Sequence, residues 1–205
     1  LDRTRSEGSW QAWPMPLVLR EADAMQKARS DLGGAIRQVK FEQFAFRTQW
    51  NALRKHARSK NVELLGDVPI FVALHSADVW GNPKQFQLDD ERCPQVVAGV
   101  PPDYFSETGQ RWGNPLYDWE TMRRDGYRWW IQRFRSVLDD VDWARIDHFR
   151  GFESYWEIPA DADTAINGRW VKGPGREVFD AIFDALGVLP GLAEDLGIIT
   201  HEVDQ

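Results

Sequence analysis

Apolar residues recur at three- and four-residue spacing along two long stretches of the chain. In residues 41–60 the apolar positions are Phe41, Phe44, Ala45, Trp50, Leu53 and Ala57. In residues 118–138 they are Tyr127, Trp130, Ile131, Phe134 and Leu138. Because this spacing gathers apolar side chains on one side of a helix, it predicts an amphipathic helix over each stretch. A third helix is expected over residues 177–186.

Short apolar runs between the helical stretches predict strands. One run covers residues 62–72 and is interrupted by Gly66 and Asp67, where we expect the strand to end. Two further runs cover residues 143–149 and 189–193. Helices and strands therefore alternate along the chain, which favours parallel strands joined by crossover helices.

Two segments lack either periodicity. Residues 1–16 contain polar residues, a glycine and two prolines, and we expect irregular structure there. Residues 73–115 are rich in Gly, Pro, Asn and Asp, and they predict one long loop. A loop of that length inside a compact domain is usually functional.

Each predicted strand ends in acidic residues: Asp67, Asp147, and then Glu194 with Asp195. In a β/α barrel the carboxyl ends of the strands form the rim of the active site. The pattern therefore predicts an α/β fold, specifically part of a (β/α)8 barrel with acids at its mouth. A complete barrel needs about 250 residues and eight strand–helix units, so we expect the 205 residues to be an internal part of a larger catalytic domain.

Composition narrows the class of protein. With 42% hydrophobic and 28% charged residues the chain has a globular composition. A net charge of −7 argues against nucleic acid as a partner, because phosphate binding needs a basic surface. The longest apolar run, residues 68–74, is too short to span a membrane. Cys93 is the single cysteine, which excludes an internal disulfide and suits a reducing compartment such as the cytoplasm.

Tryptophan is unusually frequent, at 11 residues of 205. Large aromatic residues are mostly core residues, and we expect this for most of the tryptophans. Sugar-binding sites also favour indole rings, whose faces match the C–H face of a pyranose. The count alone does not decide between these roles.

Three of the acidic and basic positions suggest glycoside chemistry. Arg145 and Asp147 lie two apart on a predicted strand, so they point the same way, and the guanidinium favours an ionised carboxylate. Glu194 follows an apolar run, where partial desolvation would raise its pKa. One charged and one protonated carboxyl group form the working pair of glycoside hydrolysis and transfer. A structural ion pair and a helix cap explain the same pattern equally well.

Longer motifs resolve this ambiguity. In order along the chain stand GDVPIFVA (66–73), SADVW (76–80), VAGVPPDYFS (97–106), TGQ (108–110), WGNPLY (112–117), RIDHFRG (145–151) and AEDLG (193–197). In these motifs the chain closely resembles the 4-α-glucanotransferases of glycoside hydrolase family 77, also called amylomaltases or disproportionating enzymes. The resemblance runs from about residue 10 to residue 205, and the number and order of the motifs make it highly specific.

The resemblance implies roles for individual residues. Asp147 matches the catalytic nucleophile, Glu194 the general acid/base, and Arg145 the arginine held against the nucleophile. The residues expected to bind substrate are Arg145, His148, Asp67, Trp112, Asn114 and Tyr104. For His148, packing beside the strand is an equally good alternative. Residues 100–109 match the loop that arches over the cleft.

The family also implies a reaction. A segment of an α-1,4-glucan is transferred to the 4-hydroxyl of an acceptor glucan or glucose by a retaining double displacement, without metal or organic cofactor. The expected partners are maltooligosaccharides and fragments of starch or glycogen, not nucleic acid or membranes. The expected location is the cytoplasm, or the plastid in a plant. The family's third carboxylate, an aspartate after a histidine, has no counterpart in these 205 residues, so we expect the isolated chain to be inactive.

Two other functions compete with this interpretation. A metal-dependent barrel hydrolase could use Asp67, Asp147, His148, Glu194 and Asp195 as ligands. A non-catalytic glucan-binding protein could keep the aromatic residues and lose the chemistry. Its mark would be a missing nucleophile or acid, and the sequence contains both.

Overall fold

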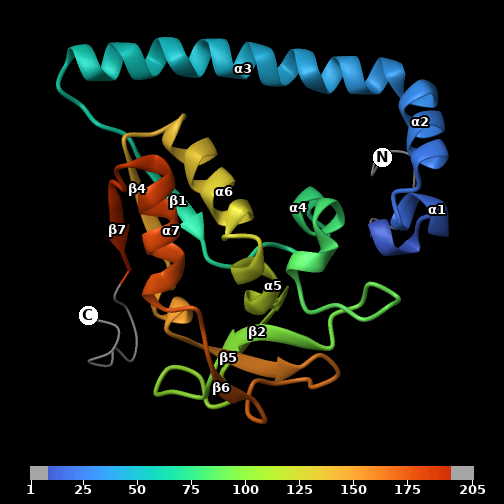
Figure 1. The fold of residues 1–205 in the computed structure, drawn as a ribbon. Coiled ribbons are helices and arrows are strands. Elements are labelled where there is room, and N and C mark those ends of the chain that lie inside the picture. The colour runs from blue at the N-terminus through green and yellow to red at the C-terminus, as the bar shows by residue number, and fades with distance from the viewer. Residues whose placement is uncertain (1–8, 195–205) are drawn as a thin grey trace. The chain divides into compact units, whose positions relative to one another are not determined.

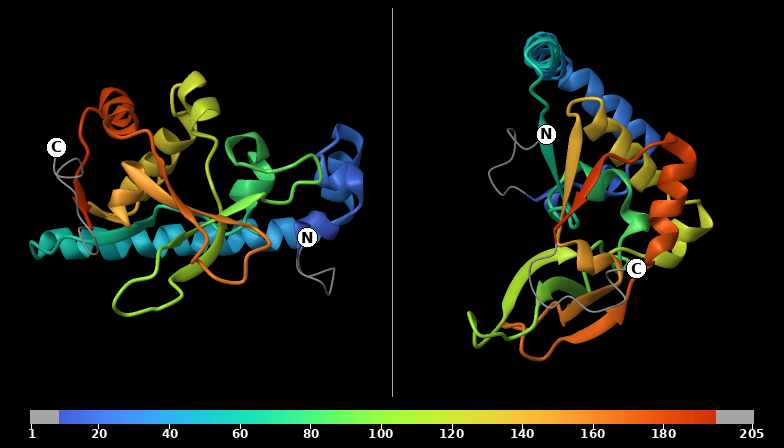
Figure 2. Two further views of the ribbon diagram at one scale, coloured as in Figure 1. Left: turned by 90° about the horizontal axis from the view of Figure 1, so that it is seen from below. Right: turned by 90° about the vertical axis from the view of Figure 1, so that its left-hand side faces the viewer.

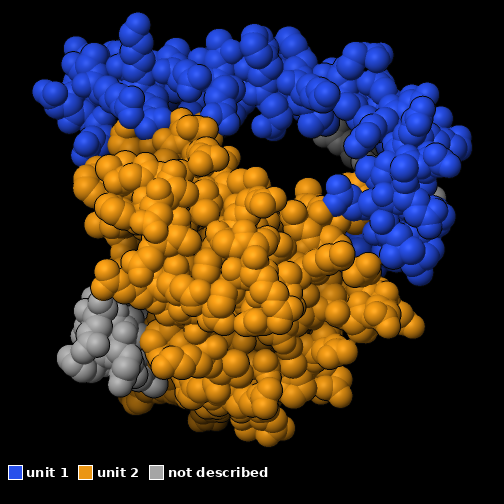
Figure 3. Space-filling model, in the orientation of Figure 1, with its two compact units in different colours: residues 1–63 blue, residues 64–205 orange. Residues whose placement is uncertain are grey.

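The computed structural model describes residues 9–194. The chain divides into two compact units, residues 1–63 and 64–205, which are coloured separately in Figure 3. Among the described residues, no helix is long and apolar enough to cross a membrane.

The first unit is helical (Figure 1). It contains a short 3-10 helix, Trp10–Ala12, and the helices α1 (Met15–Val18), α2 (Ala22–Asp31) and α3 (Gly33–Ser59). The helix predicted over residues 41–60 is confirmed, and it begins eight residues earlier than its apolar pattern. The prediction of irregular structure for residues 1–16 is wrong for those that form the 3-10 helix and the start of α1. Proline is compatible with the first turn of a helix, where no backbone donor is needed.

The second unit contains a parallel sheet made of β1 (Leu65–Pro69), β4 (Trp143–Asp147) and β7 (Gly191–Ala193), in the order β1-β4-β7. The three predicted strands are thus confirmed, with shorter bounds. However, β1 continues through Gly66 and Asp67 and does not end there. A Cβ at Gly66 would lie 2.9 Å from a methyl group of Val141, so this glycine allows close packing inside a strand.

Helices connect the parallel strands, as the alternating pattern predicted (Figures 1 and 2). The single helix predicted over residues 118–138 is instead two, α5 (Trp119–Arg124) and α6 (Arg128–Leu138). The chain breaks between them because Gly126 and Tyr127 both have positive φ, 71° and 55°. The predicted third helix is confirmed as α7 (Arg176–Leu186).

A second, antiparallel sheet was not predicted. Its strand order is β3-β2-β5-β6, with bounds β2 (Val96–Val100), β3 (Gln110–Pro115), β5 (Ser154–Pro159) and β6 (Arg169–Lys172). Residues 73–115 are therefore not one loop, since they also contain α4 (Ala77–Gly81) and a 3-10 turn, Pro83–Gln85. Because Gly and Pro are frequent in this segment, its sequence does not show the alternation that predicts strands. The loop that joins β2 to β3 is limited to residues 101–109. A short 3-10 helix, η4 (Phe149–Phe152), links β4 to β5.

The described residues do not form a closed barrel, because their parallel sheet has only three strands. What they do show is the mixed α/β character that the sequence predicted. The carboxyl ends of the parallel strands lead toward the antiparallel sheet (Figure 2). Asp147 and Glu194 line a cavity together with residues of β2, β3 and β6.

The core of the second unit is built around Tyr117, which is 1% exposed. Its ring lies 4.9 Å from Trp119 and 5.4 Å from Trp130, and its hydroxyl donates to the carbonyl oxygen of Ile70 at 2.6 Å. A buried phenol needs such a partner, and the bond ties the segment after β1 to the core. The expectation that most tryptophans are core residues is wrong, since only Trp10, Trp119, Trp129 and Trp130 are buried.

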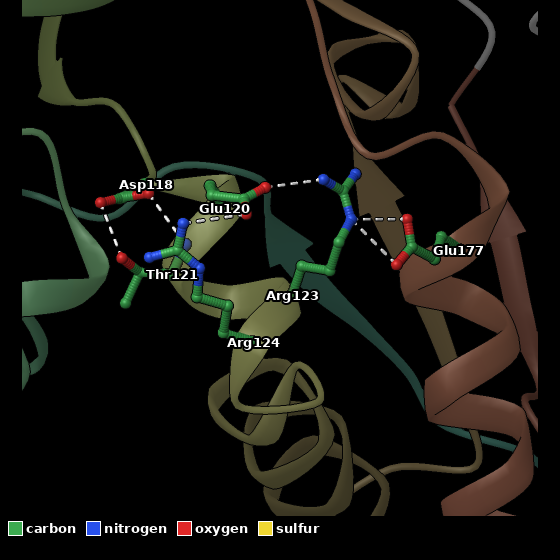
Figure 4. A network of polar contacts seen from close by, with 6 residues as sticks. All are labelled: Asp118, Glu120, Thr121, Arg123, Arg124 and Glu177. Atoms are coloured by element: carbon green, nitrogen blue, oxygen red, sulfur yellow. Dashed lines mark hydrogen bonds and ion pairs between the residues drawn. The ribbon is translucent and has the colours of Figure 1, made fainter.

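Polar contacts tie α5 to α7 at the surface (Figure 4). Asp118 caps α5 by accepting from the Thr121 amide at 2.9 Å. Arg123 reaches Glu177 of α7 and Glu120 of its own helix, each at 2.9 Å. Because these side chains are exposed, salt and water screen the pairs, and they orient the helices more than they stabilise them.

Gly99 allows β2 and β3 to approach, and we expect its substitution to destabilise the second unit. A Cβ there would overlap the Gln110 carbonyl oxygen and the Ile158 side chain. Gly99→Ala should therefore lower the free energy of unfolding by about 2 kcal/mol or more, measured by denaturant unfolding. The control is Gly34→Ala, where a Cβ meets nothing within 4 Å. Equal stability of the two variants would contradict this account of the hairpin.

Candidate active site

Arg145 joins carboxylates that come from all three parallel strands. Its Nε donates to Asp67 Oδ1 at 2.7 Å, its Nη2 to Asp147 Oδ1 at 3.0 Å, and its Nη1 pairs with Glu194 Oε1 at 3.1 Å. One planar guanidinium thus serves three carboxylates, using the fork of donors that only arginine has. The arginine fixes where each carboxylate points.

The register of the sheet explains why these side chains meet. Arg145 lies in the central strand, directly opposite Asp67 of β1 and Leu192 of β7. Asp147 is two residues further along β4 and so projects on the same side as Arg145. Glu194 comes just after β7, and its amide donates to the Ile146 carbonyl oxygen at 3.0 Å. Parallel strands that end together therefore bring the acids together.

His148 turns the chain out of the sheet beside these acids. Its φ of 51° is left-handed, which directs its backbone N–H to Glu194 Oε2 at 2.7 Å. Its ring packs edge-on against Trp112, with centroids 4.9 Å apart, and its buried Nε2 has no hydrogen-bond partner among the described residues. Burial, with Arg150 nearby, lowers the pKa of His148 to about 4. The imidazole is therefore neutral near pH 7.

The pKa values of the two central carboxyl groups are shifted in directions that the sequence did not predict. Burial and a hydrogen bond with Glu194 raise the pKa of Asp147, against the effect of Arg145. The backbone N–H of His148 lowers the pKa of Glu194, and Asp147 and Arg145 add to this. The prediction that Glu194 has the raised pKa, and Asp147 the favoured charge, is therefore wrong for this structure. The physical reason is the amide of His148, which sequence spacing does not reveal.

These residues line one cavity of about 420 Å³. One wall consists of Asp147, His148 and Glu194. A second wall comes from the β2–β3 hairpin, including Phe105, Gln110 and Trp112. The third consists of Arg150 and Trp170. A larger, mostly apolar cavity of about 560 Å³ lies between β4, β7 and α7 but contains none of the three carboxylates, so size does not locate the chemistry.

The structure brings most of the predicted site residues together. Asp147, Glu194, His148 and Trp112 line the cavity, and Arg145 joins Asp67 to them. Four of the six predicted substrate-binding residues, Arg145, Asp67, Asn114 and Tyr104, are not among the described residues that line it. Asn114 donates its amide to the Val72 carbonyl oxygen at 3.0 Å, and Tyr104 is 98% exposed on the 101–109 loop. Asp195 lies outside the described residues.

Several cavity residues were missed by the sequence analysis as site residues. Arg150 stands in the RIDHFRG motif, where its charge was the available signal. Trp170 carried only the signal of tryptophan frequency, and Gln110 only its place in the TGQ motif. Their positions depend on the antiparallel sheet, which was not predicted.

Residues 9–194 contain no group of three or more His, Cys, Asp or Glu side chains that is placed to hold a metal ion. The carboxylates at the strand ends surround a guanidinium, so a protein cation already stands at their centre. This arrangement suits carboxylate chemistry on a sugar better than the ligand set of a metal hydrolase.

Comparison with known proteins agrees with this geometry. The family model described as "4-alpha-glucanotransferase", of glycoside hydrolase family 77, matches residues 1–205. The chain belongs to this family. It is 53% identical to the 4-alpha-glucanotransferase of Thermus thermophilus and 47% identical to the chloroplastic/amyloplastic enzyme of Solanum tuberosum. These matches cover 95% and 100% of this chain but 39% and 36% of the relatives.

A solved family 77 structure has the same fold over this region. The amylomaltase from Streptococcus agalactiae in complex with acarbose superposes with a TM-score of 0.95 at 39% identity. The match covers 99% of this chain and 41% of the amylomaltase. The chain thus spans about two fifths of the length of its relatives.

We expect His148 to stay neutral across the range in which histidines normally titrate. Its imidazole should show a midpoint near pH 4, because protonation would place an unpaired charge beside Arg150. NMR titration of the full-length protein containing this chain checks this, with the signal assigned by its loss in His148→Asn. Asparagine is chosen because it tolerates positive φ. A midpoint above pH 6 would contradict the buried environment.

Proposed function

We propose that the full-length protein containing this chain is a 4-alpha-glucanotransferase acting on α-1,4-glucans. It would transfer a glucan segment to the 4-hydroxyl of another glucan or of glucose. The single observation that carries the proposal is the Asp147–Arg145–Glu194 cluster at adjacent strand ends, opening into a cavity with aromatic walls. Family membership supports it, as does the acarbose complex of the Streptococcus agalactiae amylomaltase.

In the first half-reaction Asp147 attacks the anomeric carbon and Glu194 protonates the departing oxygen. Arg145 holds Asp147 at 3.0 Å and so directs its oxygen at the substrate. Retaining enzymes hold their two carboxyl groups about 5–5.5 Å apart, with the anomeric carbon between them. Because the His148 amide lowers the pKa of Glu194, Glu194 has to gain a proton as substrate binds before it can act as an acid.

In the second half-reaction Glu194 acts as a base. Once Asp147 is esterified it carries no charge, and Glu194 keeps the hydrogen bond from the His148 amide and the ion pair with Arg145. Both contacts stabilise the carboxylate form. Glu194 then takes the proton of the acceptor's 4-hydroxyl, and the new bond has the same anomeric configuration as the old one.

We further propose that these 205 residues form part of a (β/α)8 barrel in that protein. The remaining strands and the third carboxylate would come from segments outside this chain. The proposed location is the cytoplasm, or the plastid in a plant. The Solanum tuberosum relative is described as chloroplastic/amyloplastic.

Replacing the nucleophile tests the assignment. In the full-length protein, Asp147→Asn should lower maltotriose disproportionation at least about a thousandfold, because the glucosyl-enzyme cannot form. Binding of maltoheptaose should persist. The matched control is Asp180→Asn, an exposed aspartate paired with Arg176 on α7. Near-normal turnover by Asp147→Asn would show that another residue is the nucleophile, and full loss of wild-type activity after chelation would favour the metal hydrolase.

The 101–109 loop is expected to keep water from the intermediate. Phe105 lines the cavity and forms an edge-to-face pair with Tyr104 at 5.7 Å. Replacing both by alanine should raise the ratio of glucose release by hydrolysis to glucan transfer, because the apolar cover is removed. Glu107→Ala, exposed on the same loop, is the control. An unchanged ratio in the double variant would assign water exclusion to other segments.

A further inference from the structure

Trp170 is an aromatic side chain at the cavity that no part of the proposed reaction uses. It lies in β6, at the edge of the antiparallel sheet, and its side chain is 41% exposed. It lines the same cavity as Asp147 and Glu194. A large indole surface left exposed beside catalytic carboxylates needs a reason, because burial would otherwise be favourable.

Two neighbours hold the indole in place. The guanidinium of Arg150, only 7% exposed, stacks over the ring with its carbon 4.0 Å from the centroid. Arg150 is itself held by a bond to Ser154 Oγ at 3.2 Å. On the neighbouring strand, Trp156 meets Trp170 edge-on at 5.2 Å and is anchored by its own bond to the Ala165 carbonyl oxygen. Trp170 is therefore ordered before any ligand arrives.

We propose that Trp170 is a binding platform for a glucosyl unit of the α-1,4-glucan, stacking on the C–H face of the sugar. The inference rests on the proposed function, since it takes the ligand to be the same glucan. A rigid aromatic surface suits this role because little side-chain freedom is lost on binding. Arg150 acts as a positioning residue that sets the orientation of the indole.

The alternative is that Trp170 merely covers the charge of Arg150. The two roles differ in what they affect. A cover contributes to stability and not to glucan affinity. A platform contributes to glucan affinity, and another aromatic ring can replace it.

The test uses the full-length protein carrying Asp147→Asn, so that glucan is bound without turnover, with maltoheptaose titrated by calorimetry. Adding Trp170→Ala should raise the Kd about five- to tenfold, the size expected for one lost aromatic contact. Trp170→Phe should stay within about twofold of the parent, because the ring is retained. The control is Trp143→Ala: Trp143 is 38% exposed, begins β4 at the far end from Asp147, and does not line the cavity.

The proposal is overturned if Trp170→Ala changes the Kd by less than about twofold and lowers the Tm. Trp170 would then only cover the charge of Arg150. A Trp170→Phe variant as weak as Trp170→Ala would overturn the proposal too. Disproportionation of maltotriose by the otherwise unaltered protein is measured in parallel. If that protein fails to transfer glucan yet Trp170→Ala still weakens binding, the proposed function is wrong and the platform stands.

Discussion

The pairing of Arg145 with three carboxylates is the interaction on which the candidate site depends. Three acids on neighbouring strands would repel one another, and a single guanidinium offsets that repulsion by bonding to each. The arginine can do this only from the central strand, with Asp67 on one side and Glu194 on the other. Lysine has its three donors on a single nitrogen, so it lacks the planar fork with which the three nitrogens of Arg145 each meet a different carboxylate. The register of the sheet therefore determines which carboxylates can reach Arg145.

His148 adds a second constraint on the same acids. It has a left-handed backbone conformation and lies between the end of β4 and the start of the short helix η4. Its backbone N–H donates to Glu194. The raised pKa of Asp147 and the lowered pKa of Glu194 are the reverse of what the first half-reaction requires. The proposed transfer thus depends on substrate entry to change the relative proton affinities of the two carboxyl groups.

The antiparallel sheet completes the cavity from the other side. Gly99 lets β3 approach β2, and β3 carries Gln110 and Trp112 to one wall. Strand β6 carries Trp170 to another wall, and Trp156 of β5 packs against Trp170 from behind the lining. The parallel sheet supplies the reactive groups and the antiparallel sheet supplies surfaces for a sugar. Two of the tryptophans outside the core, Trp112 and Trp170, lie in this cavity.

The sequence by itself determined the parallel strands, the helical character of residues 41–60, 118–138 and 177–186, and the acidic ends of the second and third strands, because hydrophobic periodicity and side-chain alternation are local properties. Its motifs also identified Asp147, Glu194 and Arg145 as neighbours. The antiparallel sheet was not predictable, since glycine and proline mask β2 and β3 and their pairing is between distant residues. The direction of the pKa shifts of Asp147 and Glu194 was not predictable from the sequence either, and neither was the place of Trp170 in the cavity. Each depends on a backbone amide or a stacked side chain that only the tertiary structure brings into contact.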